Sequence, residues 1–206
     1  LNNVAIAARA ALEKGVRRAL IVDFDVHHGN GTQEAFEEEP SVCYFSTHLY
    51  PFYPGTGHWQ ERGQGAGEGT VINVPLPAQV GDEGYKRVFT QVLPPLARRC
   101  RPDLILVSAG YDGHWHDPLA LMGLSIAGFT FITRTLKDLA DELCQGHLVF
   151  TLEGGYDHQV LSQAVLTTFF LLEGEDPPSD PFGLSPYPEP DISELLARVK
   201  QLHGSS

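Results

Sequence analysis

Residues 19–31 constrain the fold and the chemistry of this chain more than any other stretch. An apolar run at residues 20–22 predicts a strand buried on both faces, as in a parallel sheet. Asp23, Asp25 and His27 follow at alternate positions, and side chains two residues apart on a strand point to the same side. Buried carboxylates without partners are strongly disfavoured. We therefore predict a divalent metal ion at the carboxyl end of a parallel sheet, where open α/β sheets bind ligands.

A single Asp or His at a strand end is more often a loop hydrogen-bonding residue or a helix cap. The combination of two carboxylates, an imidazole and two following glycines on one strand end favours the metal site instead, because charged residues are seldom buried without partners.

Length and charge narrow the class of protein. The 206 residues suffice for one α/β domain, and the net charge of −12 disfavours direct binding of nucleic acid. No apolar stretch is long enough to span a membrane and no signal peptide is evident, so we predict a cytoplasmic protein. Cys43, Cys100 and Cys144 have no Cys-x-x-Cys spacing, which predicts buried free thiols in a reducing compartment.

Helical and strand patterns alternate along the chain. Together they predict an α/β fold, a three-layer α/β/α arrangement with a mainly parallel sheet. Predicted strands lie at residues 20–22, 41–45, 71–74, 104–107 and 148–152. Predicted helices cover residues 4–12, 32–36, 82–96, 126–143 and 159–172, with a last one from residue 191. Asp82 and Asp191 are predicted helix caps, and Pro94 and Pro95 a kink.

Three of these strands end in polar residues. Besides the first strand, residues 104–107 lead to Asp112, and residues 148–152 lead to Tyr156. Asp25, His27 and Asp112 would supply one nitrogen and two carboxylate ligands, which suits a catalytic zinc with an open position, although iron(II) or cobalt could use the same set. Tyr156 is either a donor to an oxyanion or a core tyrosine. Glycines at these ends leave room for the metal and a ligand: Gly110, Gly113, Gly154 and Gly155.

Five motifs together resemble the zinc-dependent histone deacetylase family, in its class II-like and prokaryotic form related to acetylpolyamine amidohydrolases. They are residues 22–33, 53–57, 108–112, 117–118 and 153–156. The resemblance spans Leu1 to about Leu172 and implies the arginase/deacetylase fold with the N-terminal part of the domain missing. Residues 1–174 would be a partial catalytic domain, residues 175–190 a proline-rich surface loop, and residues 191–206 a C-terminal helix and tail.

The resemblance also implies roles for individual residues. Asp25, His27 and Asp112 would bind one Zn²⁺, and Tyr156 would stabilise the oxyanion. The substrate pocket would involve His28, Tyr53, Gly110, Leu119, Gly154 and Gly155, with Tyr53 on the tunnel wall and Leu119 near the mouth. A structural K⁺ or Na⁺ near the zinc would use Asp23, Asp25, His27, Ser46 and Thr47. A second one would use carbonyls of Phe36, Glu39, Val42 and Thr70.

The implied reaction is hydrolysis of the acetyl amide of acetyl-lysine in a protein, by water that the metal activates. The family uses a tandem histidine pair upstream of the first zinc strand as general base and acid. Because that pair would lie upstream of Leu1, outside this sequence, we expect this chain alone to be weakly active or inactive. Acetylated polyamine is the alternative substrate, and a non-catalytic module that binds acyl-lysine or a partner is the alternative function. An oligomer is compatible with the sequence.

A related arginase-type site with two metals is disfavoured. The two extra carboxylates are absent, because position 29 is glycine and position 114 is histidine. We expect His114 and His116 to be loop histidines, since further ligands would close the open coordination position.

Overall fold

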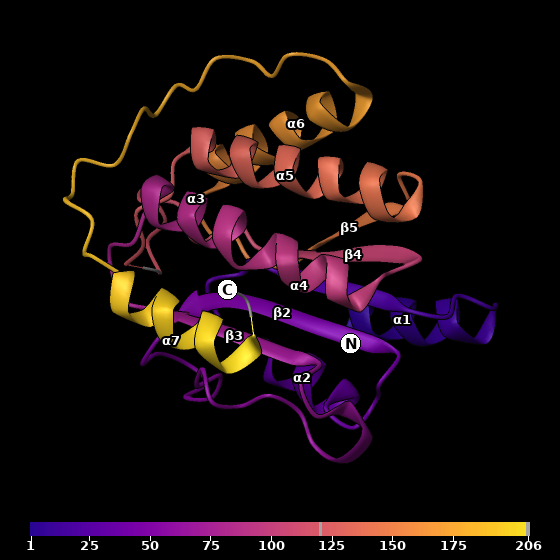
Figure 1. Ribbon diagram of the computed structural model, residues 1–206. Helices are drawn as coiled ribbons and strands as arrows, with labels where there is room; N and C mark the ends of the chain where they lie inside the picture. Colours follow the sequence, from indigo (N-terminus) through magenta and orange to yellow (C-terminus); the bar gives the residue numbers. More distant parts are fainter. Residues whose placement is uncertain (120, 205–206) are drawn as a thin grey trace.

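The structure, a computed structural model, describes residues 1–119 and 121–204. Within them, five parallel strands form one sheet in the order β3-β2-β1-β4-β5 (Figure 1). The strands are β1 (Ala19–Asp23), β2 (Val42–Leu49), β3 (Val71–Leu76), β4 (Leu104–Ala109) and β5 (Leu148–Leu152). The predicted parallel α/β fold is confirmed.

Helices cover both faces of the sheet. In the described part of the chain they are α1 (Asn3–Glu13), α2 (Asn30–Phe36), α3 (Asp82–Gln91), α4 (Leu93–Cys100), α5 (Ile126–Cys144), α6 (His158–Glu173) and α7 (Ser193–His203), with a short 3-10 turn η1 (Gly65–Gly67). In Figure 1, α1 and α2 lie on one side of the sheet and α3 to α7 on the other.

Strand β1 lies at the centre of the sheet, and its apolar side chains are buried on both faces. Leu20 and Val22 belong to the larger core, which includes side chains of α3, α4, α5 and α7, whereas Ala19 and Ile21 pack with α1 and α2. Burial of both faces is expected for a parallel strand between helical layers. The alternation continues past the strand, so that Phe24 lies in the larger core.

The helix predicted around Pro94 and Pro95 is divided, not kinked. Helix α3 ends at Gln91, Val92 separates the two, and the prolines fall in the first turn of α4, where their missing N–H groups cost little. Asp82 is also not the cap of α3. Its carboxylate instead accepts hydrogen bonds from the backbone N–H and the hydroxyl of Ser125, at the start of α5.

The other predicted cap, Asp191, lies one residue before the N-cap position of α7, which Ile192 occupies. The Asp191 carboxylate accepts hydrogen bonds from the N–H and hydroxyl groups of Ser193.

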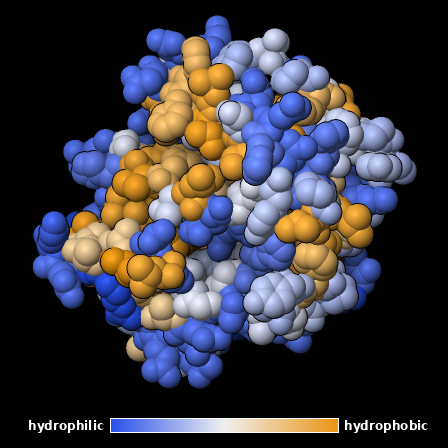
Figure 2. Space-filling model, turned by 180° about the vertical axis from the view of Figure 1, so that it is seen from behind, coloured by the Kyte–Doolittle hydropathy of each residue, from blue (hydrophilic) through white to orange (hydrophobic). Residues whose placement is uncertain are grey.

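Strand β5 is an edge strand, and not the fully buried strand that its apolar sequence predicted. Among the described residues it pairs with β4 alone, and Val149 and Leu152 are 47% and 52% exposed. Leu166 and Phe169 of α6 are exposed as well. Figure 2 shows apolar areas between polar side chains on the face seen from behind. Local hydrophobicity does not distinguish a central strand from an edge strand, because the order of strands depends on long-range pairing.

The cysteine prediction was wrong for two residues. Cys43 on β2 and Cys100 at the end of α4 form a disulfide, although 57 positions separate them, and Cys144 is a buried free thiol. The prediction of a reducing compartment was based on three free thiols, and the disulfide removes that basis. Among the described residues, no helix is both long and apolar enough to cross a membrane.

Residues 175–190 run over the surface between α6 and α7 (Figure 1). Within this segment Phe182 packs against His114 and His116, and the carbonyl of Gly183 accepts a hydrogen bond from the Trp115 indole. The proposed division at residues 174 and 190 stays a prediction.

Candidate metal centre

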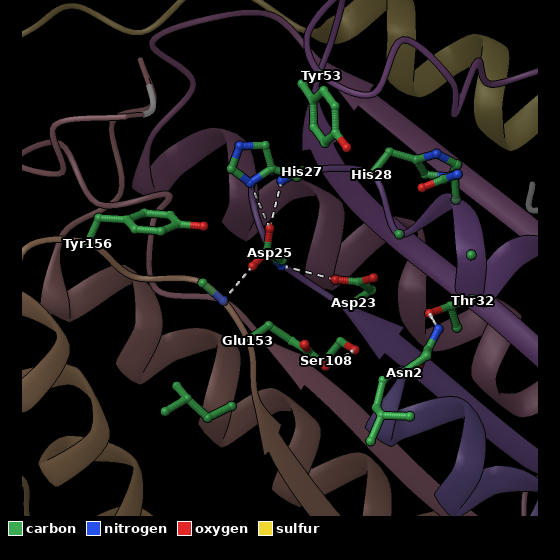
Figure 3. A pocket seen from close by; sticks show the side chains of 16 residues that line it. Asn2, Asp23, Asp25, His27, His28, Thr32, Tyr53, Ser108, Glu153 and Tyr156 are labelled. Atoms are coloured by element: carbon green, nitrogen blue, oxygen red, sulfur yellow. Dashed lines mark hydrogen bonds and ion pairs between the residues drawn. The ribbon is translucent and has the colours of Figure 1, made fainter.

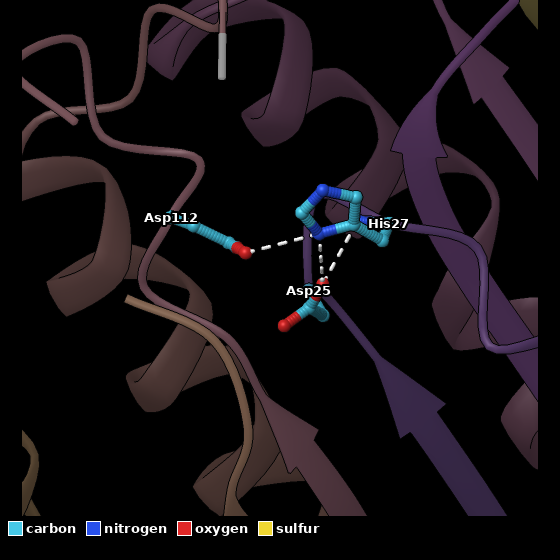
Figure 4. A group of neighbouring side chains, drawn as sticks. All are labelled: Asp25, His27 and Asp112. Carbon is cyan, nitrogen blue, oxygen red and sulfur yellow. Dashed lines mark hydrogen bonds and ion pairs between the residues drawn. The ribbon is translucent and has the colours of Figure 1, made fainter. Parts of the chain in front are cut away.

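The three predicted ligands lie together at the carboxyl edge of the sheet. Asp25 and His27 follow β1, and Asp112 follows the neighbouring strand β4. Because β1 and β4 are parallel and Asp23 pairs with Ser108, both strands end at the same edge. One ligand atom from each of the three residues lies within 4.8 Å of the others (Figure 4). The structure therefore brings together side chains that are up to 87 positions apart in the sequence (112 minus 25).

The distances suit one shared cation. Nδ1 of His27 lies 3.2 Å from Oδ1 of Asp25 and 3.2 Å from Oδ2 of Asp112. Oδ2 of Asp112 is buried and has no hydrogen-bond partner among the described residues, since its contact with the imidazole lacks hydrogen-bond geometry. A buried carboxylate oxygen without a partner is costly. A cation held by one imidazole and two carboxylates removes that cost, so the residues present fit a zinc-type site.

Backbone N–H groups hold the two carboxylates in place. Oδ1 of Asp112 accepts a hydrogen bond from the N–H of Val26 at 3.0 Å. Asp25 accepts from the N–H of His27 at 2.8 Å and, through Oδ2, from the N–H of Gly154 at 2.8 Å. Each ligand is thus fixed by a neighbouring segment, which is how supporting hydrogen bonds orient metal ligands.

The two carboxylates of the site favour binding of a positive charge, either a proton or a metal cation. Burial raises the pKa of Asp112, and the Asp25 carboxylate raises it further. Contact with Asp112, and then with Asp25, raises the pKa of His27 to about 10 against the opposing effect of burial. The negative field that binds a proton at His27 also favours a divalent cation, which would displace that proton.

Gly110 and Gly154 permit the close approach that the sequence predicted. A Cβ at Gly110 would lie 2.1 Å from Oδ2 of Asp25, and a Cβ at Gly154 would lie 2.1 Å from Oδ2 of Asp112. Any larger residue at these positions would have to displace a ligand carboxylate. Gly155 has a φ of 138°, which other residues rarely adopt.

Asp23 lies outside the group of three and supports it. Its Oδ1 accepts a hydrogen bond from the N–H of Asp25 at 3.1 Å, and its Oδ2 accepts one from the Tyr44 hydroxyl at 2.9 Å. Burial and the nearby Asp25 raise the pKa of Asp23 well above its usual range. Of its predicted partners at a monovalent cation, Ser46 is hydrogen-bonded to His48, and the Thr47 hydroxyl contacts the Asp23 carbonyl at 3.5 Å.

The second predicted monovalent site consists of backbone carbonyls that already accept hydrogen bonds. The carbonyl of Phe36 accepts from Glu39, that of Glu39 from Val42, and that of Thr70 from Tyr44. A carbonyl oxygen has two lone pairs, so these bonds leave one acceptor position on each.

A cavity of about 790 Å³ adjoins the candidate ligands. Its lining includes Asp25, His27, His28, Tyr53, Gly154 and Tyr156 (Figure 3). Tyr53 is largely exposed, and its ring meets the imidazole of His27 edge-on at 6.2 Å between centroids. Leu119, Gly110 and Gly155 are not among the lining residues, so the structure does not bring Leu119 to the cavity wall.

Tyr156 lies at the rim, with its hydroxyl directed toward Asp25 and His27 in Figure 3. Its side chain is 48% exposed, so it is not a core tyrosine. Partial burial raises the pKa of its phenol, and the carboxylates of Asp112 and Asp25 raise it further. The phenol is therefore protonated at neutral pH and is available as a hydrogen-bond donor.

The comparisons with known proteins agree with this arrangement. The family description "Histone deacetylase domain" matches residues 1–172, most of the chain. This chain belongs to the histone deacetylase family. It is 45% identical to "Histone deacetylase 14, chloroplastic" of Arabidopsis thaliana, over 98% of this chain and 49% of that protein. It is 44% identical to a "Probable deacetylase" of Archaeoglobus fulgidus, over 97% of this chain and 55% of that protein.

Solved deacetylase structures have the same fold. The crystal structure of the HDA15 HD domain superposes with a TM-score of 0.86 and 38% identity, covering 98% of this chain and 54% of that one. The three-layer arginase/deacetylase fold predicted from the sequence is thus confirmed. The chain described here spans about half the length of the curated relatives named above.

His28 is part of a buried hydrogen-bond network, and not of the ligand group. Its Nδ1 lies 2.8 Å from the Thr56 hydroxyl and its Nε2 lies 3.0 Å from Oε1 of Gln33. Gln33 also accepts from Asn73 and donates to Glu61. Burial lowers the pKa of His28, which favours the neutral ring.

His114 and His116 are loop residues, as expected, and lie outside the candidate ligand group. His114 is fully buried, and burial lowers its pKa to about 4. His116 is exposed and pairs with Asp157 at 2.9 Å.

Sequence reasoning missed several residues around the ligands. Phe52 stacks on the His27 ring at 5.6 Å between centroids, and the Ser108 hydroxyl donates to Glu153. Phe52 lies in the irregular stretch between β2 and β3, and no spacing pattern connects it with His27. Glu153 is the first residue of the motif at 153–156, but it was given no role, and burial raises its pKa.

Proposed function

We propose that this chain is part of a zinc-dependent deacetylase that hydrolyses the acetyl amide of acetyl-lysine. The observation that supports this most is the convergence of Asp25, His27 and Asp112, with the Tyr156 phenol directed at the same point. The proposal has one Zn²⁺ per chain, held by these three side chains. When bound, zinc would polarise the acetyl carbonyl and lower the pKa of a water molecule.

Tyr156 donates a hydrogen bond to the carbonyl oxygen as negative charge develops on it. Its raised pKa supports this role, because the phenol keeps its proton at neutral pH. A donor that strengthens its bond in the transition state lowers the barrier more than it strengthens substrate binding. His28 is not the proton acceptor for water, since Thr56 and Gln33 engage both of its ring nitrogens. We assign that role to the tandem histidine pair that the family resemblance implies, upstream of Leu1.

The cavity next to the ligands accepts the acetylated side chain. Tyr53 lines it, and Phe52 stacks on His27 beside it, so aromatic rings stand where the aliphatic part of lysine would pass. Aromatic rings pack well against an apolar methylene chain. An acetylated polyamine has a similar chain and is the alternative substrate in the test below.

We further propose a K⁺ or Na⁺ ion at Asp23, beside the zinc. A buried carboxylate whose pKa is raised by burial and by a second carboxylate is stabilised by a nearby cation. The second monovalent site, at Phe36, Glu39, Val42 and Thr70, and the cytoplasmic location stay predictions.

The function is tested with a fluorogenic acetyl-lysine peptide on the full-length protein after zinc reconstitution. We expect acetate release that a hydroxamate chelator abolishes and that Asp112→Ala removes. Release from acetylated polyamine alone would replace the substrate with the alternative. Tight binding of the peptide by calorimetry without any release would support the binding module and contradict the proposed hydrolase.

A further inference from the structure

We infer that Asp117 is a positioning residue for Tyr156. The inference rests on the proposed function, because it concerns the phenol that would stabilise the oxyanion. Asp117 is buried, with only 6% of its surface exposed, and its carboxylate connects two loops that each contribute to the site.

The Asp117 carboxylate accepts three backbone hydrogen bonds. Oδ2 accepts from the N–H of Tyr156 at 2.8 Å and from the N–H of Asp157 at 3.2 Å. Oδ1 accepts from the N–H of Leu119 at 2.9 Å, within its own loop. Two consecutive peptide groups on either side of the Tyr156 Cα are therefore bound to one oxygen atom. Hydrogen bonds to a charged acceptor are stronger than neutral ones.

The side chain of Tyr156 has few contacts of its own, so the position of its phenol depends on its backbone. The described residues give its hydroxyl no hydrogen bond, and its ring is half exposed. The two preceding residues are Gly154 and Gly155, and glycine restricts the backbone less than any other residue. Strand β5, which precedes Tyr156, is the last strand of the sheet in the described chain, so no strand supports it on its outer side.

The loop that carries Asp117 is itself well anchored and begins at the ligand Asp112. The N–H of Asp117 donates to the carbonyl of His114 at 2.9 Å, and the N–H of Trp115 donates to Leu124 at 2.8 Å. His114 is fully buried in this loop. Asp117 thus connects the backbone of Tyr156 to the segment that contains the candidate ligand Asp112. This connection fixes the position of the phenol relative to the metal site.

A second contact joins the same two loops but is weaker. His116 pairs with Asp157 at 2.9 Å, and this histidine is about half exposed. Exposed pairs contribute little, on the order of 0–1 kcal/mol. Asp157 also caps α6 through the N–H groups of Gln159 and Val160, so the tyrosine loop is held on its helical side as well.

The test variant is Asp117→Asn in the zinc-loaded full-length protein. The asparagine side chain has only one acceptor oxygen. It can therefore accept either from the Leu119 N–H or from the N–H groups of Tyr156 and Asp157. Its NH₂ group then faces the remaining N–H donor or donors, with which it cannot form a hydrogen bond. We expect kcat to fall about 10- to 100-fold, the range that a small misplacement of a catalytic group produces. KM and the zinc content should stay unchanged.

Asp103→Asn is the matched control. The Asp103 carboxylate also accepts two consecutive backbone N–H groups, those of Arg17 and Arg18, but at the opposite end of the sheet. We expect this variant to keep the wild-type kcat. In a Tyr156→Phe background, Asp117→Asn should cause no further fall in kcat, because the group that it positions is already absent.

Hydrogen exchange followed by NMR tests the same inference without measuring activity. The Tyr156 and Asp157 amides of the wild-type protein should exchange more slowly than the Gly155 amide, and Asp117→Asn should abolish the difference. Equal exchange of all three amides in the wild-type protein would overturn the inference. So would a wild-type kcat in Asp117→Asn, or an equal loss in the Tyr156→Phe background. An inactive wild-type protein would instead count against the proposed function, and the exchange rates would still decide whether Asp117 holds this loop.

Discussion

The metal ligands and the tyrosine lie on the same edge of the sheet but are held in different ways. Asp25, His27 and Asp112 follow the adjacent strands β1 and β4 in the middle of the sheet, and backbone N–H groups of other segments fix their carboxylates. Tyr156 follows the edge strand β5, is half exposed, and is held through its backbone. The ligand group is thus a product of sheet packing, whereas the tyrosine depends on contacts between two loops. Substitutions in the two regions should have separable effects.

The largest effect is expected from Asp112→Ala. One oxygen of its buried carboxylate has no hydrogen-bond partner in the described part of the chain and lies at the candidate ion site. The two remaining ligands do not suffice for tight binding. We predict loss of stoichiometric zinc by metal analysis, and deacetylation reduced by at least about 10³-fold. Asp103→Ala, at the far end of β4, is the control and should keep its zinc. Undiminished zinc in Asp112→Ala would refute this ligand.

Tyr156→Phe should separate the two regions most clearly. The substitution removes only the hydroxyl, so zinc content should be unchanged while kcat falls about 10²- to 10³-fold, as for other oxyanion donors. Tyr187→Phe, on an exposed tyrosine of the 175–190 loop, is the matched control. Activity that survives in Tyr156→Phe would remove the tyrosine from the mechanism and leave the metal site intact.

Gly154→Ala tests the point where the two regions meet. The added Cβ would lie 2.1 Å from Oδ2 of Asp112 and 2.6 Å from Oδ2 of Asp25, so both ligands would have to move. We expect zinc affinity to fall about 10- to 100-fold, as for other residues that orient metal ligands. Gly31→Ala is the control, because its Cβ would meet only Asn2, at 3.9 Å. Equal zinc affinity in both variants would show that Gly154 does not constrain the ligands.

The smallest effect concerns pH and the buried side of the site. His48 donates from Nε2 to the carbonyl of Gly57 and accepts from the Ser46 hydroxyl at Nδ1, which requires a neutral ring. Burial lowers its pKa to about 3 from an ordinary value of 6.5. Between these values the unfolded chain binds a proton that the folded chain does not. The associated stability is therefore complete above pH 6.5 and is lost as the pH falls toward 3.

We predict that His48→Gln makes the free energy of unfolding less dependent on pH in this range. Between neutral pH and about pH 5, the wild-type free energy of unfolding should fall by roughly 2 kcal/mol more than that of the variant. A pH of about 5 lies about 1.5 units below the ordinary pKa of 6.5, and one unit corresponds to about 1.4 kcal/mol. Urea unfolding in the presence of a chelator measures this without interference from metal release. His158→Gln, on the surface of α6, should follow the wild-type curve. Parallel curves for His48→Gln and the wild type would contradict a neutral buried His48.

The sequence predicted the parts that follow from local pattern and parallel pairing. Apolar runs alternating with amphipathic segments were enough for a parallel sheet with helices on both faces. Since parallel strands end at one edge, the residues after β1 and β4 had to lie close together, and Asp25, His27 and Asp112 do so.

What the sequence did not predict depends on contacts between distant segments. The edge position of β5 and the Cys43–Cys100 disulfide both arise from the order in which elements pack. Asp117 belonged to a recognised motif, but its bonds to Tyr156 and Asp157 cross 39 and 40 positions of sequence and leave no periodic signal.

X-ray absorption at the zinc edge of the reconstituted protein tests the central claim most directly. The account predicts one zinc per chain, coordinated by one imidazole nitrogen and by oxygen atoms at about 2.0–2.2 Å, without sulfur. Sulfur neighbours at about 2.3 Å, or a second metal at about 3.5–4 Å, would contradict a single ion bound by Asp25, His27 and Asp112.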